Sequence, residues 1–246
     1  STPLRGLGLI SGTAAAVNGA TILNAQVGVR HNVTGKWFDG VGFNVVSADP
    51  FFINATGLGG GPFAFTYGGV SDSKLVNRSS YTVVSKASDD AGNVEGGAQG
   101  NNGTGRAFTF TFDVDLPTAT VSMPANGSFR RAGQITTLSG TAADATSVVK
   151  TIDLFIRRST DGWYWQDASG SGFGSWANTI AAPIALSTAG QPAWSYVLGN
   201  ETQIFADNIA YTVYAKATDA ADNAQAAFGV GTSSSSFTYA TQLPTS

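Results

Sequence analysis

One stretch of sequence occurs twice, and the distance between its copies constrains the fold more than any other feature. Residues 81–95 read YTVVSKASDDAGNVE, and residues 211–225, which lie 130 positions later, read YTVYAKATDAADNAQ. In each copy, alternating side chains run into a cluster of Asp, Ala, Gly and Asn. This pattern predicts a half-buried strand that ends in a tight turn. A strand and its turn repeated at the spacing of a domain predict a tandem β protein.

Further segments recur at spacings between 127 and 130 residues. Residues 9–14 (LISGTA) match residues 138–142 (LSGTA), and the Leu-Pro-Thr at 116–118 matches the one at 243–245. The chain of 246 residues is long enough for two domains of ordinary size. We therefore predict one domain over residues 1–116 and a second over residues 117–246.

The composition excludes several classes of protein. Charged residues make up 12% of the chain, about half of the usual share of roughly 25%, and the net charge is −3. An acidic chain with scattered Lys and Arg is a poor partner for nucleic acid. There is no cysteine, so disulfides and thiolate metal sites are excluded. A hydrophobic content of 42% supports a packed core, and we expect no membrane-spanning segment because no apolar run is long enough. Because the chain opens with Ser-Thr-Pro, we expect a processed product or part of a longer protein.

Several short strands are predicted in each half. The best alternation lies in residues 24–33, 63–67 and 107–114 of the first half, and the second half repeats it. Thr160-Asp161-Gly162 predicts a hairpin turn between two such runs. Residues 39–62 and 166–191 are predicted to be connections with one short edge strand each, and residues 1–8, 96–105 and 233–236 to be irregular. Strands in this order without helices predict two antiparallel β-sandwiches, with Tyr81 and Tyr211 at the position of a tyrosine corner.

These motifs resemble a known family. Ser-Gly-Thr-Ala (11–14), Tyr-Thr-Val (81–83), Ala-Ser-Asp-Asp-Ala-Gly-Asn (87–93) and a last strand that runs into Asp-Leu-Pro-Thr (115–118) are similar to the bacterial immunoglobulin-like repeats of large cell-surface and adhesin proteins. The resemblance implies an extracellular repeat module of a stalk, adhesin arm or filament. It also implies neighbouring copies or adjacent repeats as partners, and Ca²⁺ at the domain junction.

Acidic turn residues are the candidate metal ligands. Hard oxygen ligands are what Ca²⁺ prefers, and we hypothesise that Asp89, Asp113 and Asp115 share one ion. Asp and Asn side chains also cap turns by hydrogen bonding, which is the favoured interpretation. No cofactor is required by either interpretation. The candidate ligands are Asp89, Asp90, Asn93, Asp113, Asp115, Asp219, Asp222 and Asn223.

Catalysis has little support in this sequence. Nucleophilic and acid–base mechanisms depend on His, Cys or paired carboxylates, and the chain has one His and no Cys. That residue, His31, lies beside a predicted hairpin turn, where we expect an exposed side chain rather than a catalytic one.

Aromatic residues in the second half give an alternative function. Trp163, Tyr164, Trp165 and Trp176 are a candidate platform for sugar rings, as in a carbohydrate-binding module. Alternation puts Trp163 and Trp165 on one face and Tyr164 on the other. Because aromatic side chains dominate cores and interfaces, packing is the favoured interpretation.

The chain also carries six patterns of the N-glycosylation acceptor type. A chain this rich in Asn, Ser and Thr produces about three by chance, and all six fall in predicted turns or loops. The candidate acceptors are Asn32, Asn54, Asn77, Asn102, Asn126 and Asn200.

The two copies differ in what precedes the Ser-Gly-Thr-Ala motif. In the second copy, Ala119, Val121 and Met123 alternate with Thr118, Thr120 and Ser122, which predicts a first strand for the sandwich. Residues 1–9 of the first copy do not repeat this pattern. We therefore predict that the first domain lacks its first strand and exposes a sheet edge, which is a template for adding a strand from elsewhere.

Overall fold

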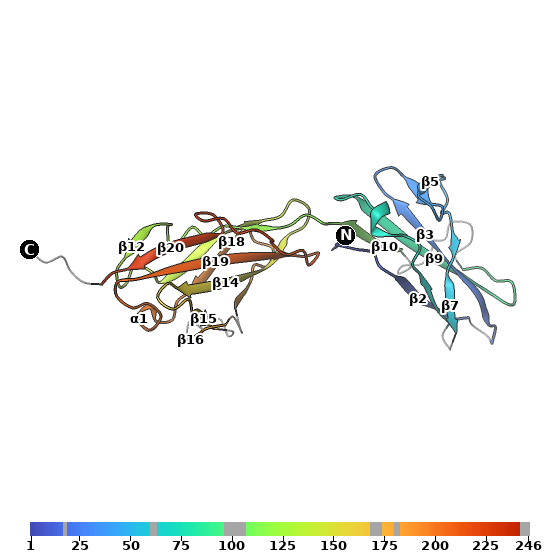
Figure 1. Cartoon of the computed structure of the whole chain (residues 1–246). Helices are drawn as coiled ribbons and strands as arrows, with labels where there is room; N and C mark the ends of the chain where they lie inside the picture. Colours follow the sequence, from blue (N-terminus) through green and yellow to red (C-terminus); the bar gives the residue numbers. More distant parts are fainter. Residues whose placement is uncertain (17–18, 60–62, 96–106, 168–173, 180–182, 242–246) are drawn as a thin grey trace, which may run out of the picture. The chain divides into compact units, whose positions relative to one another are not determined.

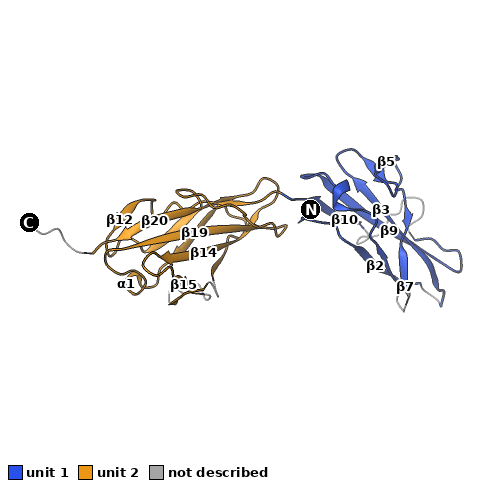
Figure 2. Cartoon of the chain, in the orientation of Figure 1, with its two compact units in different colours: residues 1–114 blue, residues 115–246 orange. Residues whose placement is uncertain are grey.

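The computed structural model describes residues 1–241 except for 17–18, 60–62, 96–106, 168–173 and 180–182. It divides into two compact units, Ser1–Val114 and Asp115–Ser246, which we call unit 1 and unit 2 (Figure 2). Both units are built almost entirely of strands (Figure 1). Each unit contains a large sheet and a small sheet that share one interior, and this architecture is an immunoglobulin-like β-sandwich.

Unit 1 contains a large sheet and a three-stranded sheet. The large sheet has the order β1-β10-β9-β3-β4-β5, with β6 also paired to β3, and the small sheet has the order β2-β8-β7. Strand β1 pairs with β10 in parallel, while the other pairs are antiparallel. The elements are β1 (Thr2–Leu4), β2 (Ile10–Ala14), β3 (Ile22–His31), β4 (Lys36–Phe38), β5 (Phe43–Val46), β6 (Ile53–Asn54), β7 (Thr56–Gly59), β8 (Phe63–Tyr67), the 3₁₀ helix η1 (Asp72–Lys74), β9 (Ser80–Asp89) and β10 (Ala107–Phe112).

Unit 2 repeats this arrangement with a different third strand in the small sheet, since β11 lies at its edge and no described strand corresponds to β7. The large sheet has the order β12-β20-β19-β14-β15-β16, with β17 also paired to β14, and the small sheet has the order β11-β13-β18. The parallel pair recurs as β12 with β20. The elements are β11 (Thr118–Ala119), β12 (Ser128–Arg130), β13 (Thr137–Ala143), β14 (Val149–Arg158), β15 (Tyr164–Gln166), β16 (Ser175–Ala177), β17 (Ile184–Ser187), β18 (Ala193–Val197), α1 (Glu201–Ile204), β19 (Ile209–Asp219) and β20 (Ser234–Tyr239).

Alternation along the central strands builds each core. Tyr211, Val213, Ala215 and Ala217 point into unit 2 from β19 and are fully buried, whereas the residues between them are half-buried. The equivalent strand of unit 1, β9, buries Tyr81, Val83 and Ala87. The two strands with the clearest sequence repeat are therefore the centre of each sandwich.

The tyrosine corner is confirmed in both units. The hydroxyl of Tyr81 accepts a hydrogen bond from the backbone N–H of Val76 at 2.8 Å. The hydroxyl of Tyr211 accepts one from Ala206, also at 2.8 Å. Each bond fixes the chain that crosses from one sheet to the other, because it ties the start of the strand to the loop before it.

Four sequence predictions about irregular segments are wrong. Residues 39–62 contain three strands (β5, β6 and β7) rather than one, and residues 166–191 contain two (β16 and β17). The predicted serine loop at 233–236 mostly belongs to β20, because the edge of β19 supplies backbone partners for it. Residues 2–4 of the supposedly irregular start form β1. The predicted loop at 96–105 lies outside the described residues.

Candidate functional site

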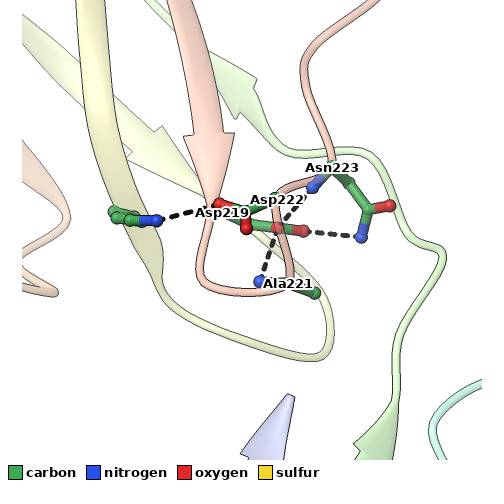
Figure 3. Close-up of polar contacts among 5 residues, drawn as sticks. Asp219, Ala221, Asp222 and Asn223 are labelled. Atoms are coloured by element: carbon green, nitrogen blue, oxygen red, sulfur yellow. Dashed lines mark hydrogen bonds and ion pairs between the residues drawn. The ribbon is translucent and has the colours of Figure 1, made fainter. Parts of the chain in front are cut away.

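The repeated Asp and Asn residues close a turn at the end of β9 and of β19. In unit 2, Asp219 Oδ1 accepts hydrogen bonds from the backbone N–H groups of Ala221 and Asn223, each at 2.8 Å, and Oδ2 accepts one from the Asn223 side chain at 3.0 Å (Figure 3). In unit 1, Asp89 accepts the same three bonds from Ala91 and Asn93. Bonds to Asn93 lower the pKa of Asp89. These side chains therefore cap turns, as Asp and Asn commonly do.

Asp90 and Asp222 play separate parts in these turns. Asp90 Oδ1 accepts a hydrogen bond from the backbone N–H of Thr21 at 3.0 Å, and this links the turn to the start of β3. Asp222 adopts a positive φ of 65° and its carboxylate lies 2.9 Å from the ammonium group of Lys150. Both members of that ion pair are exposed, so it adds little stability.

The predicted ion shared by Asp89, Asp113 and Asp115 does not fit the topology. Asp89 is the last residue of β9, whereas Asp113 follows β10, whose Thr111 pairs with Ser80 at the opposite end of β9. The ten residues of β9 separate the two carboxylates by roughly 30 Å. The hypothesis of one ion bound by these residues is wrong. Asp115 belongs to unit 2, where the hydroxyl of Thr146 donates a hydrogen bond to it.

One acidic residue near the Asp219 turn was missed by the sequence analysis. Asp144 follows β13, and a carboxylate oxygen of Asp144 lies within 4.8 Å of one from Asp219. Asp144 Oδ1 accepts hydrogen bonds from the backbone N–H groups of Thr146 and Ser147, each at 2.8 Å. The first copy has Ala16 at the corresponding position, so the repeat gave no signal for Asp144.

His31 is buried rather than exposed, which corrects the sequence prediction. Its ring stacks on Tyr81 with a centroid distance of 4.8 Å, and Phe43 meets it edge-on at 5.8 Å. The hydroxyl of Thr34 lies 3.2 Å from Nδ1. Burial lowers the pKa of His31. Its ring packs against two aromatic side chains, so the residue belongs to the core of unit 1.

The aromatic cluster of unit 2 does not form a platform. Trp165 is only 4% exposed and belongs to the core, and the Trp176 ring packs against it edge-on at 5.6 Å. Trp163, which precedes β15, is 40% exposed. Tyr164 is half-buried. A sugar ring requires exposed ring faces, and here the large aromatic faces are mostly used for packing.

The candidate glycosylation residues differ in the exposure and the hydrogen bonds of their side chains. Asn32 donates its amide group to Ser80 Oγ at 2.8 Å and is half-buried. Asn126 and Asn54 are exposed, although Asn54 lies in strand β6 rather than in a loop. Asn200 caps helix α1, and the side-chain oxygen Oδ1 of Asn77 accepts a hydrogen bond from the backbone N–H of Val114 at 3.1 Å. Asn102 lies outside the described residues.

A groove of about 510 Å³ opens along β2 in unit 1. Its lining comes from β2, β9, β10 and the segment after β1. Apolar side chains are exposed along it, with Leu9 60% exposed and Phe108 47% exposed. Exposed apolar side chains gathered along one groove mark a surface for interaction. We call this feature the unit 1 groove.

The fold defines the chain as a tandem of two immunoglobulin-like β-sandwiches. No protein-family model matches the sequence, and no curated protein matches it. Among solved structures, the fibronectin(III)-like modules of Clostridium thermocellum CbhA match 97% of this chain over 89% of theirs, at 10% identity and a TM-score of 0.41.

Two adhesins are also similar in structure. A 1.5-MDa bacterial ice-binding adhesin shares 15% identity over 95% of this chain, which spans 58% of that structure, with a TM-score of 0.33. The sialic acid binding region of a Streptococcus sanguinis adhesin shares 10% identity over 98% of this chain and 75% of its own, with a TM-score of 0.26. In the part of this chain that the structure describes, the helices are too short to cross a membrane.

Proposed function

We propose that this chain is a structural repeat module of an extracellular surface protein, such as a stalk, an adhesin arm or a filament. The observation that carries the proposal is the repetition of one sandwich, in which each unit has its own core and tyrosine corner. Repeated modules with separate cores are suited to extending a chain and bearing load, because a domain with its own core can in principle fold alone. Neighbouring modules connect through strand or edge contacts.

The role requires no catalytic residue and no cofactor. His31 lies in an aromatic core, and the Asp89 and Asp219 carboxylates are engaged by turn amides. We therefore propose a non-enzymatic protein. Calcium remains testable at Asp144 and Asp219 of unit 2, where two carboxylates approach each other.

Localisation tests the proposal directly. An antibody raised against the chain should label intact cells of the source organism, and protease added outside those cells should remove the signal. Labelling that occurs only after the cells are opened would contradict an extracellular module. A cytoplasmic protein of known abundance serves as the control for cell integrity.

Polysaccharide retention separates the structural role from carbohydrate binding. In affinity gels that contain a panel of polysaccharides, a structural module should migrate as it does in a gel without them. A Trp163→Ala variant is the matched control, because Trp163 is the most exposed ring of the former platform. If a polysaccharide retards the parent chain but not this variant, the chain is a carbohydrate-binding module and not only a structural one.

A further inference from the structure

At the edge of the small sheet, unit 2 carries a segment that has no counterpart among the described residues of unit 1. In unit 2, residues 118–123, which we call the lead-in segment, run antiparallel to β13 at the edge of the small sheet. The backbone N–H of Ser122 donates to the Ser139 carbonyl at 2.8 Å, and that of Thr120 donates to Thr141 at 2.7 Å. In unit 1, the small sheet ends at β2, with no described strand on its outer side.

The side chains of the lead-in segment complete the core of unit 2. Ala119 is 3% exposed and Val121 is 8% exposed, and both belong to the single core cluster of that unit. In unit 1, the buried residues divide into two clusters, one around Tyr81 and Phe110 and another around Phe65. The unit 1 groove lies where the lead-in segment would join them.

Some residues of unit 2 are covered by the lead-in segment or by Pro124, which follows it. Their equivalents in unit 1 are more exposed. Ser235 of β20 is 1% exposed and donates its hydroxyl to the Pro124 carbonyl at 2.6 Å. Phe108 of β10 has the equivalent position, because Phe110 and Phe237 pair with the two corner tyrosines, and it is 47% exposed. Leu138 of β13 is fully buried, whereas its equivalent Ile10 is only half-buried. The part of unit 1 that corresponds to the covered surface of unit 2 is therefore more exposed among the described residues.

The groove also offers hydrogen-bonding groups in the same positions. The register of β2 on β8 is that of β13 on β18, since Gly12 opposes Phe65 as Gly140 opposes Trp194. By this equivalence, the backbone groups of Ser11, in the place of Ser139, face the groove.

Two further features of unit 1 match those that hold the lead-in segment in unit 2. Gln225 Oε1 accepts the Ala119 N–H at 2.9 Å, and Glu95, which has the corresponding place in unit 1, is among the residues that line the groove. A Cβ on Gly140 would lie 1.8 Å from the Thr120 carbonyl oxygen, so glycine is required beneath the strand. Its equivalent Gly12 is likewise a glycine, and there the Phe65 ring lies where a Cβ would be.

We infer that the unit 1 groove binds an extended polypeptide strand with the chemistry of the lead-in segment. The strand lies antiparallel to β2, with small apolar side chains such as Ala and Val pointing inward and Thr or Ser pointing outward. It comes from a further module of the same kind as unit 2. This inference rests on the proposed function, because it names the contact through which modules connect.

Residues 96–106 of the chain itself do not supply this chemistry. They read GGAQGNNGTGR, so their only apolar side chain is that of Ala98. The alternation of Ala119 with Val121 has no counterpart there, and glycine carries no side chain to fill the groove. Occupation by this segment is nevertheless an outcome that the experiment distinguishes.

A synthetic peptide of residues 116–124 tests the inference on the full chain. Calorimetry should show one peptide bound per chain, because the groove of unit 2 is filled by its own segment. Hydrogen exchange should slow at β2 and at the start of β10, with no change in β13. A control peptide that carries Ala119→Asp and Val121→Asp should not bind, since it places two carboxylates in an apolar groove. Equal binding of the two peptides, or no binding of either, would overturn the inference.

A pair of variants of the chain locates the binding site. Phe108→Asp puts a charge into the groove and should weaken peptide affinity about tenfold or more. Thr109→Asp puts the same charge on the opposite face of β10, beside Thr82, and should change the affinity by less than about twofold. Circular dichroism checks that both variants fold, and the peptide pair still decides if one of them does not. An equal loss of peptide affinity in the two variants would show that the peptide does not bind in the groove.

Hydrogen exchange of the free chain excludes self-occupation. If the strand is absent, the β2 amides that face the groove should exchange much faster than those of β13. Protection of β2 equal to that of β13 in the free chain would mean that the chain fills its own groove, and the inference would be wrong. Cell-surface labelling is measured independently, so a failed peptide test and a failed surface assignment are distinguishable.

Discussion

Replacing a corner tyrosine by phenylalanine isolates one hydrogen bond in each sandwich. Tyr211 is fully buried, and its hydroxyl accepts the Ala206 N–H at 2.8 Å. Tyr211→Phe leaves the ring in the core and removes only the acceptor. The bond is partly buried and its donor residue is exposed, so we expect the free energy of unfolding of unit 2 to fall by about 0.5–1.5 kcal/mol, the net worth of a typical hydrogen bond. Tyr81→Phe should cost the same in unit 1, where Val76 is the donor.

The two variants also predict a difference at high pH. Burial raises the pKa of Tyr211 and of Tyr81. A phenol with a raised pKa contributes stability that is fully present below about pH 10, its ordinary pKa, and is lost as pH rises through the folded value. The phenylalanine variants lack this titration. The stability gap between parent and variant should therefore narrow above about pH 10.

Urea unfolding followed by hydrogen exchange and mass spectrometry reads each unit separately. The expected result is a lower midpoint for unit 2 alone in Tyr211→Phe and for unit 1 alone in Tyr81→Phe. Tyr164→Phe is the control, because that side chain is only half-buried and lies outside the corner. Variants within about 0.5 kcal/mol of the parent, or parallel loss of parent and variant above pH 10, would refute the assigned role of the hydroxyl.

Three further outcomes are expected. Trp194→Ala should lower the free energy of unfolding by roughly 3–5 kcal/mol in urea unfolding, because the ring is 5% exposed. Val197→Ala, on the exposed face of the same strand, is the control and should cost far less. Asp219→Ala should destabilise unit 2 through its lost turn bonds, and excess chelator should leave the melting temperature of the parent unchanged; a fall in chelator would indicate a bound cation instead. Burial lowers the pKa of His31, so its contribution is complete above about pH 6.5 and is lost as pH falls below it, and His31→Gln should remove that acid sensitivity in thermal melts.

The centre of the fold could be predicted from the sequence because its strands are long and alternate. β9 and β19 are ten and eleven residues long, and their corner tyrosines repeat at a fixed spacing. The short strands could not be predicted because their partners are distant in sequence. Residues 53–54 form β6 only because β3 lies beside them. Similarly, Ser234–Tyr239 begins with three serines, and the backbone of β19 makes it a strand.

The candidate sites show the same contrast between local features, which the sequence predicts, and contacts between distant residues, which it does not. Turn capping by Asp89 and Asp219 is local, and the sequence indicated it correctly. The shared ion was wrong because sequence order does not show that Asp89 and Asp113 lie at opposite ends of β9. The lead-in segment was predicted from alternation, and Ala119 and Val121 are buried as that pattern requires. In unit 1, no described strand pairs with the outer edge of β2. The pairing of β1 with β10 in the same unit was not indicated by the sequence.

The parallel pairing of β12 with β20 determines how unit 2 responds to tension. The chain enters the unit before β12 and leaves it after β20, and the two strands run in the same direction with Ser128 opposite Phe237 and Arg130 opposite Tyr239. Pulling on the two ends of the unit therefore slides these strands past each other in opposite directions. All the backbone bonds between them are loaded together, whereas pulling apart a hairpin breaks its bonds one after another. The β1–β10 pair gives unit 1 the same shear geometry.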